Sequence, residues 1–135
     1  MKLLGIDYGE KRIGVATSAM GMSTPLCTLV NNASIINEFK KIITEQRTQK
    51  IVIGLPLYKD GTESPNCPII REFGAKLEAE FNIPVVFHNE LLTSWEAEEY
   101  IKQTKHIKDP KKIKDMIDKV AASMLLQSYG NEKNN

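Results

Sequence analysis

The chain has 135 residues, of which 41% are hydrophobic and 26% are charged, and its formal net charge is +1. These values are typical of one globular domain with a full core, and they exclude a disordered or strongly basic chain. No run of 18 apolar residues is present and the N-terminus has no apolar signal segment, which favours a cytoplasmic protein without membrane contact. Cys27 and Cys67 are too few for a disulfide framework and fit free thiols in a reducing compartment.

The first sixteen residues predict a β-hairpin, because two apolar runs flank the short polar segment 8–11. Side chains alternate between the two faces of a strand, so Asp7 shares a face with Leu3 and Gly5. The missing side chain of Gly5 should leave open space beside this acid. Asp7 is therefore either a turn residue that bonds its own backbone or part of a functional site.

Further apolar patterns follow in chain order. Residues 25–30 predict a third strand, and residues 34–48 predict an amphipathic helix that begins at a serine N-cap. The continuous apolar run 51–55 is typical of a central parallel strand that is covered on both faces. Residues 69–81 predict a second helix, and residues 84–88 predict another buried strand.

The last third of the chain is helical and rich in lysine. A capping-box pair at Thr93 and Glu96 predicts a third helix. Seven lysines and three aspartates fall between residues 102 and 119. Asp109 should cap a final helix that ends at Gly130. We therefore expect one domain over residues 1–130 and a disordered tail over residues 131–135.

This order of elements predicts an α/β fold with a mixed sheet. The first three strands form an antiparallel meander, the later strands run parallel, and helices cover both faces. Ligands in such sheets bind at the carboxyl ends of the strands, where Asp7 and Glu90 both lie. Asp118 falls on the flank of the apolar face of the last helix. The sequence therefore predicts that three carboxylates lie near one another.

Each of these acids alone could be an ordinary strand-end or helix-surface charge. Together they indicate a site for hard divalent cations, which prefer carboxylate oxygens. Two such ions can activate a water and stabilise the leaving oxygen of a phosphodiester displacement. The three acids thus favour metal-dependent cleavage of a phosphodiester.

Beyond these acids, the chain resembles the YqgF family of Holliday junction resolvases, also described as pre-16S rRNA nucleases, which have a ribonuclease H-like fold. Five blocks carry the resemblance, in the same order and across nearly the whole chain: GIDYGEKRIGVA (5–16), IGLP (53–56), DGT (60–62), NELLTS (89–94) and IDKVAA (117–122). Asn89 and Leu91 depart from the family, which has Asp and Arg there.

The resemblance implies a metal-dependent endonuclease that cleaves structured nucleic acid. Its active-site acids and metal ligands carry over to Asp7, Glu90 and Asp118, with two Mg²⁺ or Mn²⁺ ions as the expected cofactors. The expected role is 5′ maturation of pre-16S rRNA in ribosome biogenesis, with precursor ribosomal particles as partners. The alternative is a Holliday junction resolvase that acts on branched DNA.

Several residues are candidates for substrate binding. Lys11 and Arg12 close the hairpin beside Asp7, and both could hold backbone phosphates there. Asp60 and Thr62 lie in a loop after a central strand, where a turn and a border of the substrate groove are equal alternatives. The lysine-rich segment adds three further candidates for phosphate contacts: Lys108, Lys111 and Lys112.

Two rival functions remain as alternatives. The hairpin also resembles the phosphate-binding hairpins of actin-like and sugar-kinase ATPases, but those proteins need two such domains around the nucleotide. The changes at Asn89 and Leu91 would suit a non-catalytic nucleic-acid-binding module. The sequence leaves both RNA and DNA open as substrates, and both a monomer and a homodimer as assemblies.

Overall fold

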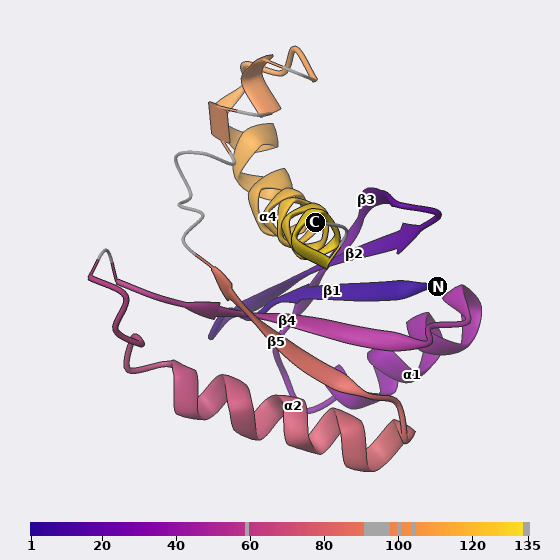
Figure 1. Ribbon diagram of the computed structural model, residues 1–135. Coiled ribbons are helices and arrows are strands. Elements are labelled where there is room, and N and C mark those ends of the chain that lie inside the picture. The colour runs from indigo at the N-terminus through magenta and orange to yellow at the C-terminus, as the bar shows by residue number, and fades with distance from the viewer. Residues whose placement is uncertain (59, 91–97, 100, 104, 134–135) are drawn as a thin grey trace.

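A computed structural model describes residues 1–58, 60–90, 98–99, 101–103 and 105–133. Its centre is a five-stranded sheet in the order β3-β2-β1-β4-β5 (Figure 1). The first three strands pair antiparallel, and β4 and β5 run parallel to β1. The strand bounds are β1 (Leu3–Asp7), β2 (Arg12–Ala19), β3 (Met22–Val30), β4 (Lys50–Pro56) and β5 (Val85–Glu90). The predicted mixed sheet is confirmed.

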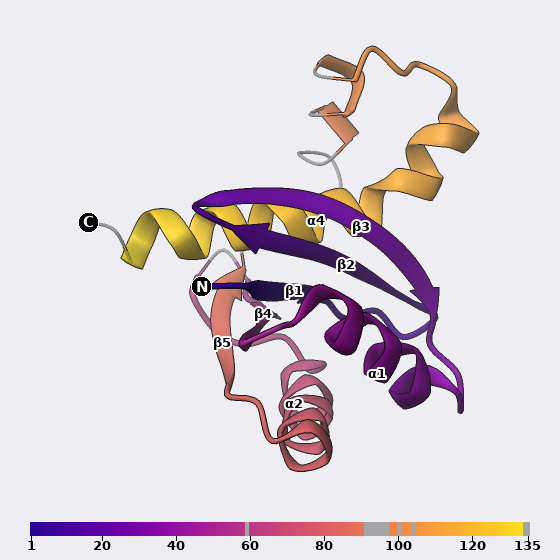
Figure 2. The same cartoon turned by 90° about the vertical axis from the view of Figure 1, so that its right-hand side faces the viewer.

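Helices cover both faces of this sheet, as predicted (Figures 1 and 2). α1 (Ile35–Gln46) and α2 (Cys67–Phe81) lie against one face, and α4 (Pro110–Lys133) crosses the other. Residues 98, 99 and 101–103 are helical, whereas the predicted capping pair at Thr93 and Glu96 lies outside the described residues. No helix among the described residues is long and apolar enough to cross a bilayer.

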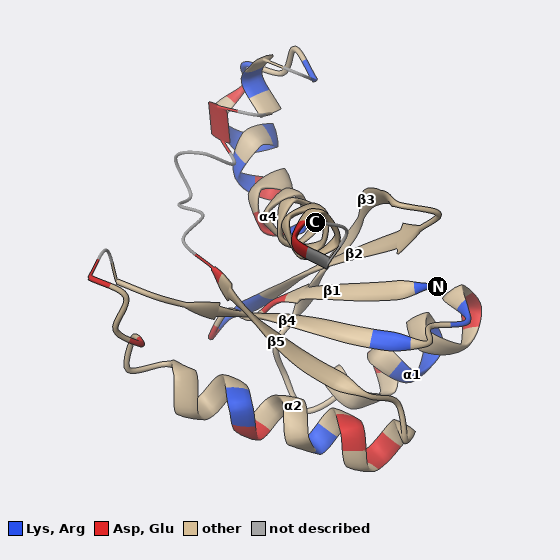
Figure 3. Ribbon diagram, in the orientation of Figure 1, with Lys and Arg blue, Asp and Glu red and all other residues tan. Residues whose placement is uncertain are grey.

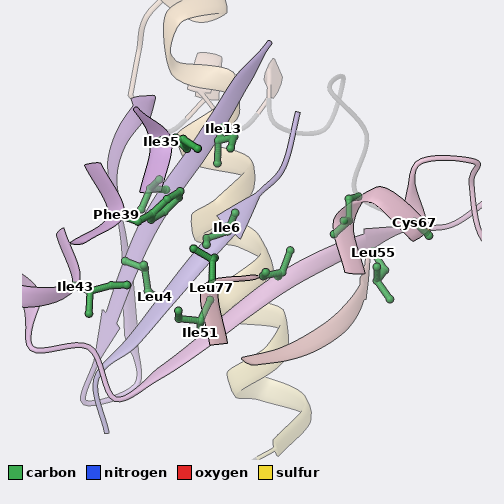
Figure 4. Packing of buried hydrophobic residues seen from close by; sticks show 13 residues of the cluster. Leu4, Ile6, Ile13, Ile35, Phe39, Ile43, Ile51, Leu55, Cys67 and Leu77 are labelled. Atoms are coloured by element: carbon green, nitrogen blue, oxygen red, sulfur yellow. The ribbon is translucent and has the colours of Figure 1, made fainter. Parts of the chain in front are cut away.

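The main core lies between the sheet and the pair α1 and α2 (Figure 4). The alternation expected for the first strand is confirmed, because Leu4 and Ile6 are fully buried in this core together with Phe39 of α1 and Leu77 of α2. On the opposite face Leu3 packs in the smaller cluster under α4. The strand therefore directs its odd-numbered residues, including Asp7, to the α4 face.

The last strand differs from the prediction. β5 forms the edge of the sheet, next to β4 only, and its Phe87 is 36% exposed, so it is not a buried strand. β4 is an interior strand, between β1 and β5, and it is covered on both faces as its continuous apolar sequence predicted. In α2 Ile70 is buried, whereas its neighbour Ile69 is 51% exposed. Continuous apolar sequence was thus a sound guide to burial in β4 and a poor one in β5, because an edge position depends on the order of the strands.

The helix ends are partly as expected. Asp109 caps α4, since its Oδ1 accepts a hydrogen bond from the backbone N–H of Lys111 at 3.0 Å. The side chain of Ser34 makes no cap bond, and Asn32 Oδ1 instead accepts from the Ser34 N–H at 2.9 Å. α4 does not end at Gly130 but continues to Lys133, so residues 131–133 are helical rather than part of a tail.

A glycine inside the last turns of α4 should weaken the helix. A Cβ at Gly130 would meet no heavy atom within 4 Å. Alanine is favoured over glycine in helices by about 0.8–1.0 kcal/mol. We therefore expect Gly130→Ala to raise the free energy of unfolding by about 0.5–1 kcal/mol in a urea titration. A destabilised variant would contradict a helix that continues through this residue.

Candidate active site

α4 lies directly on the sheet because glycines clear its path. A Cβ at Gly14 of β2 would overlap the backbone carbonyl of Asp118, and a Cβ at Gly5 would overlap the side chain of Leu126. The space that the sequence predicted to be open beside Gly5 is therefore filled by α4. On β4, a Cβ at Gly54 would lie 3.4 Å from the Cβ of Glu90. The contact at Gly14, which pairs with Asp7, places the Asp118 turn of α4 beside the carboxyl end of β1.

The three predicted acids surround this place. Asp7 ends β1 and pairs with Gly14, and Gly14 is the residue against which the Asp118 backbone packs. Glu90 ends β5 and approaches from the other side, next to Gly54. Asp7, Glu90 and Asp118 thus come from a central strand, an edge strand and the covering helix, and they meet on one face of the sheet.

The pKa of Asp7 reflects its burial and the charges of the other two acids. Burial is the largest cause that raises the pKa of Asp7, and the negative charges of Asp118 and Glu90 raise it further, to about 7. An ordinary aspartate has a pKa of about 3.9. Burial and nearby like charges both penalise the ionised form. Asp7 therefore ionises with difficulty unless a positive charge joins the group.

Asp118 has one such positive neighbour. Burial raises the pKa of Asp118, and the charge of Arg12 lowers it in part. The Nε of Arg12 lies 3.1 Å from Asp118 Oδ2, as an ion pair. No donor among the described residues reaches this buried oxygen with hydrogen-bond geometry. Arg12 is thus a counter-ion of a site acid, a role that the sequence did not reveal.

These side chains fit a divalent cation by their chemistry. Carboxylate oxygens are the preferred ligands of Mg²⁺, and a cation would relieve both the repulsion at Asp7 and the incomplete satisfaction of Asp118 Oδ2. In the part of the chain that the structure describes, no three acidic, histidine or cysteine side chains already have the geometry of a metal site. The acids are close together without being arranged around one point.

The predicted loop residues bond to each other. Asp60 Oδ1 accepts hydrogen bonds from the backbone N–H of Thr62 at 2.9 Å and from its hydroxyl at 2.6 Å. The hydroxyl bond is the largest cause that lowers the pKa of Asp60. The turn alternative thus accounts for the contacts of both residues. Leu91, one of the two departures from the family, lies outside the described residues, and Asn89 is an exposed residue of β5.

The predicted lysines occupy two places. Lys11 is exposed beside Arg12, in the loop that joins β1 and β2. Lys108, Lys111 and Lys112 are exposed before and within the first turn of α4. This part of the chain extends beyond the sheet and carries many of the basic residues (Figures 2 and 3). Lys11 thus neighbours, in sequence, the Arg12 that pairs with Asp118, whereas the other three lysines lie on the projecting start of α4.

The buried charge of Asp7 should make stability depend on pH. The folded protein retains the Asp7 proton up to a pKa of about 7, whereas the unfolded chain releases it near 3.8. Asp7 therefore favours the folded state below about pH 4, and this contribution is lost as the pH rises to about 7. One pKa unit is about 1.4 kcal/mol, so the loss is at most about 4 kcal/mol.

Urea unfolding at several pH values checks this expectation. The stability of Asp7→Asn relative to the wild type should increase by up to about 2–3 kcal/mol between pH 5 and pH 8. The wild-type slope alone is not diagnostic, because other groups titrate too. A difference between the two proteins that stays constant with pH would contradict a buried, repelled Asp7.

Solved structures with the same arrangement define the class of the fold. Thermus thermophilus RuvC superimposes with a TM-score of 0.61 at 12% identity, over 98% of this chain and 97% of that chain. The Fowlpox virus resolvase, solved with Holliday junction DNA, superimposes with a TM-score of 0.66 at 14% identity, over the whole of both chains. At these identities the likeness concerns the fold, which is the ribonuclease H-like fold of the resolvases.

The sequence places the chain in a particular family within this class. It belongs to the RuvX family, described as Holliday junction resolvase, whose profile matches residues 1–131. A protein of Syntrophus aciditrophicus is 43% identical over 96% of this chain and 87% of its own, and one of Caldanaerobacter subterraneus is 34% identical over 100% and 99%. Both carry the name "Putative pre-16S rRNA nuclease". RuvX is another name for the YqgF family, so the predicted family is confirmed. Membership of this family supports a nuclease activity.

Proposed function

We propose that this chain is a divalent-metal-dependent endonuclease that acts in the 5′ maturation of pre-16S rRNA. One observation supports the proposal most: Asp7 pairs with Gly14, against which the Asp118 backbone packs, and burial together with the charges of Asp118 and Glu90 raises the pKa of Asp7. The names of relatives that align over almost the whole chain favour precursor rRNA as the substrate. This function would place the protein in the cytoplasm with precursor ribosomal particles.

In this proposal the three acids hold the metal. Asp7, Glu90 and Asp118 would bind Mg²⁺ or Mn²⁺, and bound ions of this kind activate a water and stabilise the charge of the leaving oxygen. Asp7 ends β1, the middle strand of the sheet, and pairs with Gly14 of β2. The close approach of α4 to β2 holds the Asp118 backbone against Gly14, the partner of Asp7. This packing would keep the acids near one another before substrate binds, which favours catalysis by prearranged charges.

The exposed lysines at the start of α4 would bind the phosphate backbone. Replacing Lys108, Lys111 and Lys112 together with Gln should weaken binding to all sequences alike. The slope of log affinity against log salt should flatten by about 0.7–0.9 for each lost contact. Fluorescence anisotropy with a labelled RNA at several salt concentrations measures both quantities.

The matched control for this variant lies on the other side of the sheet. Lys40 and Lys41 of α1 and Lys76 of α2 are exposed, and their replacement with Gln removes the same total charge. We expect this control to leave the salt slope nearly unchanged. Equal effects of the two triple variants would show that only net charge matters and that the start of α4 is an ordinary solvated surface.

Cleavage assays on two substrates test the proposed function. The purified protein is incubated side by side with a precursor 16S rRNA fragment and a four-way DNA junction, each with Mn²⁺, Mg²⁺ or EDTA. The proposal predicts metal-dependent cleavage of the RNA. Cleavage of the junction alone would instead make the chain a resolvase, in line with the description of its family. Binding without cleavage of either substrate would indicate a non-catalytic module.

A further inference from the structure

Arg12 stands at the entrance to the three acids. It is the first residue of β2, two positions before Gly14, so both project to the face that α4 covers. β1 ends at Asp7, opposite Gly14, so no residue of β1 pairs with Arg12. The Arg12 side chain is 44% exposed, although its Nε lies 3.1 Å from Asp118 Oδ2. The guanidinium thus contacts a site acid and solvent at the same time.

Arg12 and a metal ion would compete for the carboxylate of Asp118. Asp118 Oδ2 is buried, and the Nε of Arg12 that lies 3.1 Å away falls short of ideal hydrogen-bond geometry, so the pairing depends mainly on charge. A divalent cation needs carboxylate oxygens as ligands. A guanidinium next to it would be repelled, since like charges at such distances destabilise each other. The two cations therefore exclude each other at Asp118.

The backbone beside Arg12 is fixed by hydrogen bonds, whereas the Arg12 side chain is partly exposed. The backbone N–H of Asn31 donates to the carbonyl of Lys11 at 2.9 Å, and Asn31 Nδ2 donates to the carbonyl of Gly9 at 3.0 Å. A Cβ at Gly9 would overlap the carbonyl of Arg12, so this turn is tightly packed. A change in the position of the guanidinium can therefore come only from rotation of the side chain.

We propose that Arg12 is an exchangeable counter-ion of the acid site, which leaves Asp118 when a divalent cation binds and then binds a phosphate of the nucleic acid. This inference rests on the proposed metal-dependent nuclease. Arginine suits the second role because its planar fork of donors matches phosphate oxygens. Metal binding and substrate binding are then coupled, since the ion releases the group that holds the phosphate.

Calorimetric titration of Mn²⁺ into the metal-free protein, without nucleic acid, tests the exchange. The variants are Arg12→Gln, Arg12→Lys and Lys11→Gln. Lys11→Gln removes the same charge one residue away and measures the general electrostatic effect. We expect Arg12→Gln to bind Mn²⁺ about fivefold more tightly than Lys11→Gln, as is typical for the loss of a partly exposed ion pair. Arg12→Lys keeps the competing charge and should remain within about twofold of the wild type.

Cleavage by the same variants tests the second half of the proposal. Arg12→Gln should cleave at least about tenfold more slowly, although it binds Mn²⁺ more tightly, because a charge-assisted bond to phosphate is lost. A residue with only a structural role would not move metal affinity and turnover in opposite directions.

Two outcomes separate this inference from the proposed function. If the wild type binds Mn²⁺ and Arg12→Gln binds it no more tightly than Lys11→Gln does, the exchange at Asp118 is wrong and the metal-dependent nuclease stands. If neither the wild type nor Arg12→Gln binds Mn²⁺, both the inference and the proposed function are overturned.

Discussion

We expect Asp7→Asn to abolish cleavage and to leave the metal-free protein at least as stable as the wild type at about pH 8. The substitution keeps the volume of the side chain but removes the carboxylate that a cation would bind. Loss of several kcal/mol of transition-state stabilisation corresponds to a fall of at least about 1000-fold in the rate of cleavage. Stability does not fall, because the ionised form of Asp7 is opposed by burial and by the charges of Asp118 and Glu90.

Glu10 supplies the control for this experiment. It is an exposed acid in the loop that follows β1, so Glu10→Gln removes the same charge near the site without touching the buried group. Single-turnover cleavage by Glu10→Gln should remain within a few-fold of the wild type, and its stability should change by less than about 0.5 kcal/mol. An Asp7→Asn protein that unfolds more easily and still cleaves would show that Asp7 is a structural residue.

Gly14→Ala should destabilise the protein strongly, because it forces α4 and β2 apart. Its Cβ would overlap the carbonyl of Asp118 and would lie 2.9 Å from the backbone nitrogen of Lys119. Since these are backbone atoms, α4 must move away from β2 to relieve the overlap. Overpacking usually costs about 1–3 kcal/mol, and a backbone clash should exceed this, with a loss of about 3 kcal/mol or more. The shift also carries Asp118 away from Asp7, so cleavage should fall as well.

Gly130→Ala is the matched control. It is the same glycine-to-alanine change, but at a position of α4 where the new Cβ meets no heavy atom within 4 Å. Urea unfolding of the two variants should give changes of opposite sign. If Gly14→Ala folds with wild-type stability and cleaves normally, α4 does not rest on β2 in the way the structure shows.

Much of the fold was predictable because its signals are local. The alternation of Leu4 and Ile6 with Asp7 assigned the faces of β1, and the continuous apolar run of β4 indicated a central strand. The nearness of the candidate acids was predictable for a related reason. Parallel strands place their carboxyl ends at one edge of the sheet, so Asp7 and Glu90 were expected to lie near each other.

The errors concern properties that depend on distant parts of the chain. The space beside Gly5 is filled by Leu126, which lies more than a hundred residues later in the sequence. The exposure of Phe87 follows from the edge position of β5 in the sheet order. The pairing of Arg12 with Asp118 likewise requires knowledge of which strand lies under α4. No spacing within a single segment carries this information.

The stabilising effect of Mn²⁺ on the wild type and on Asp7→Asn tests the convergence of the three acids most directly. Urea unfolding of both proteins is measured with and without the ion, at a concentration a hundredfold above its dissociation constant for the wild type. Mass action predicts that Mn²⁺ raises the free energy of unfolding of the wild type by about 2.7 kcal/mol. The same ion should stabilise Asp7→Asn by less than about 0.5 kcal/mol, because one of the three ligands is gone. Equal stabilisation of the two proteins would contradict a metal site that contains Asp7.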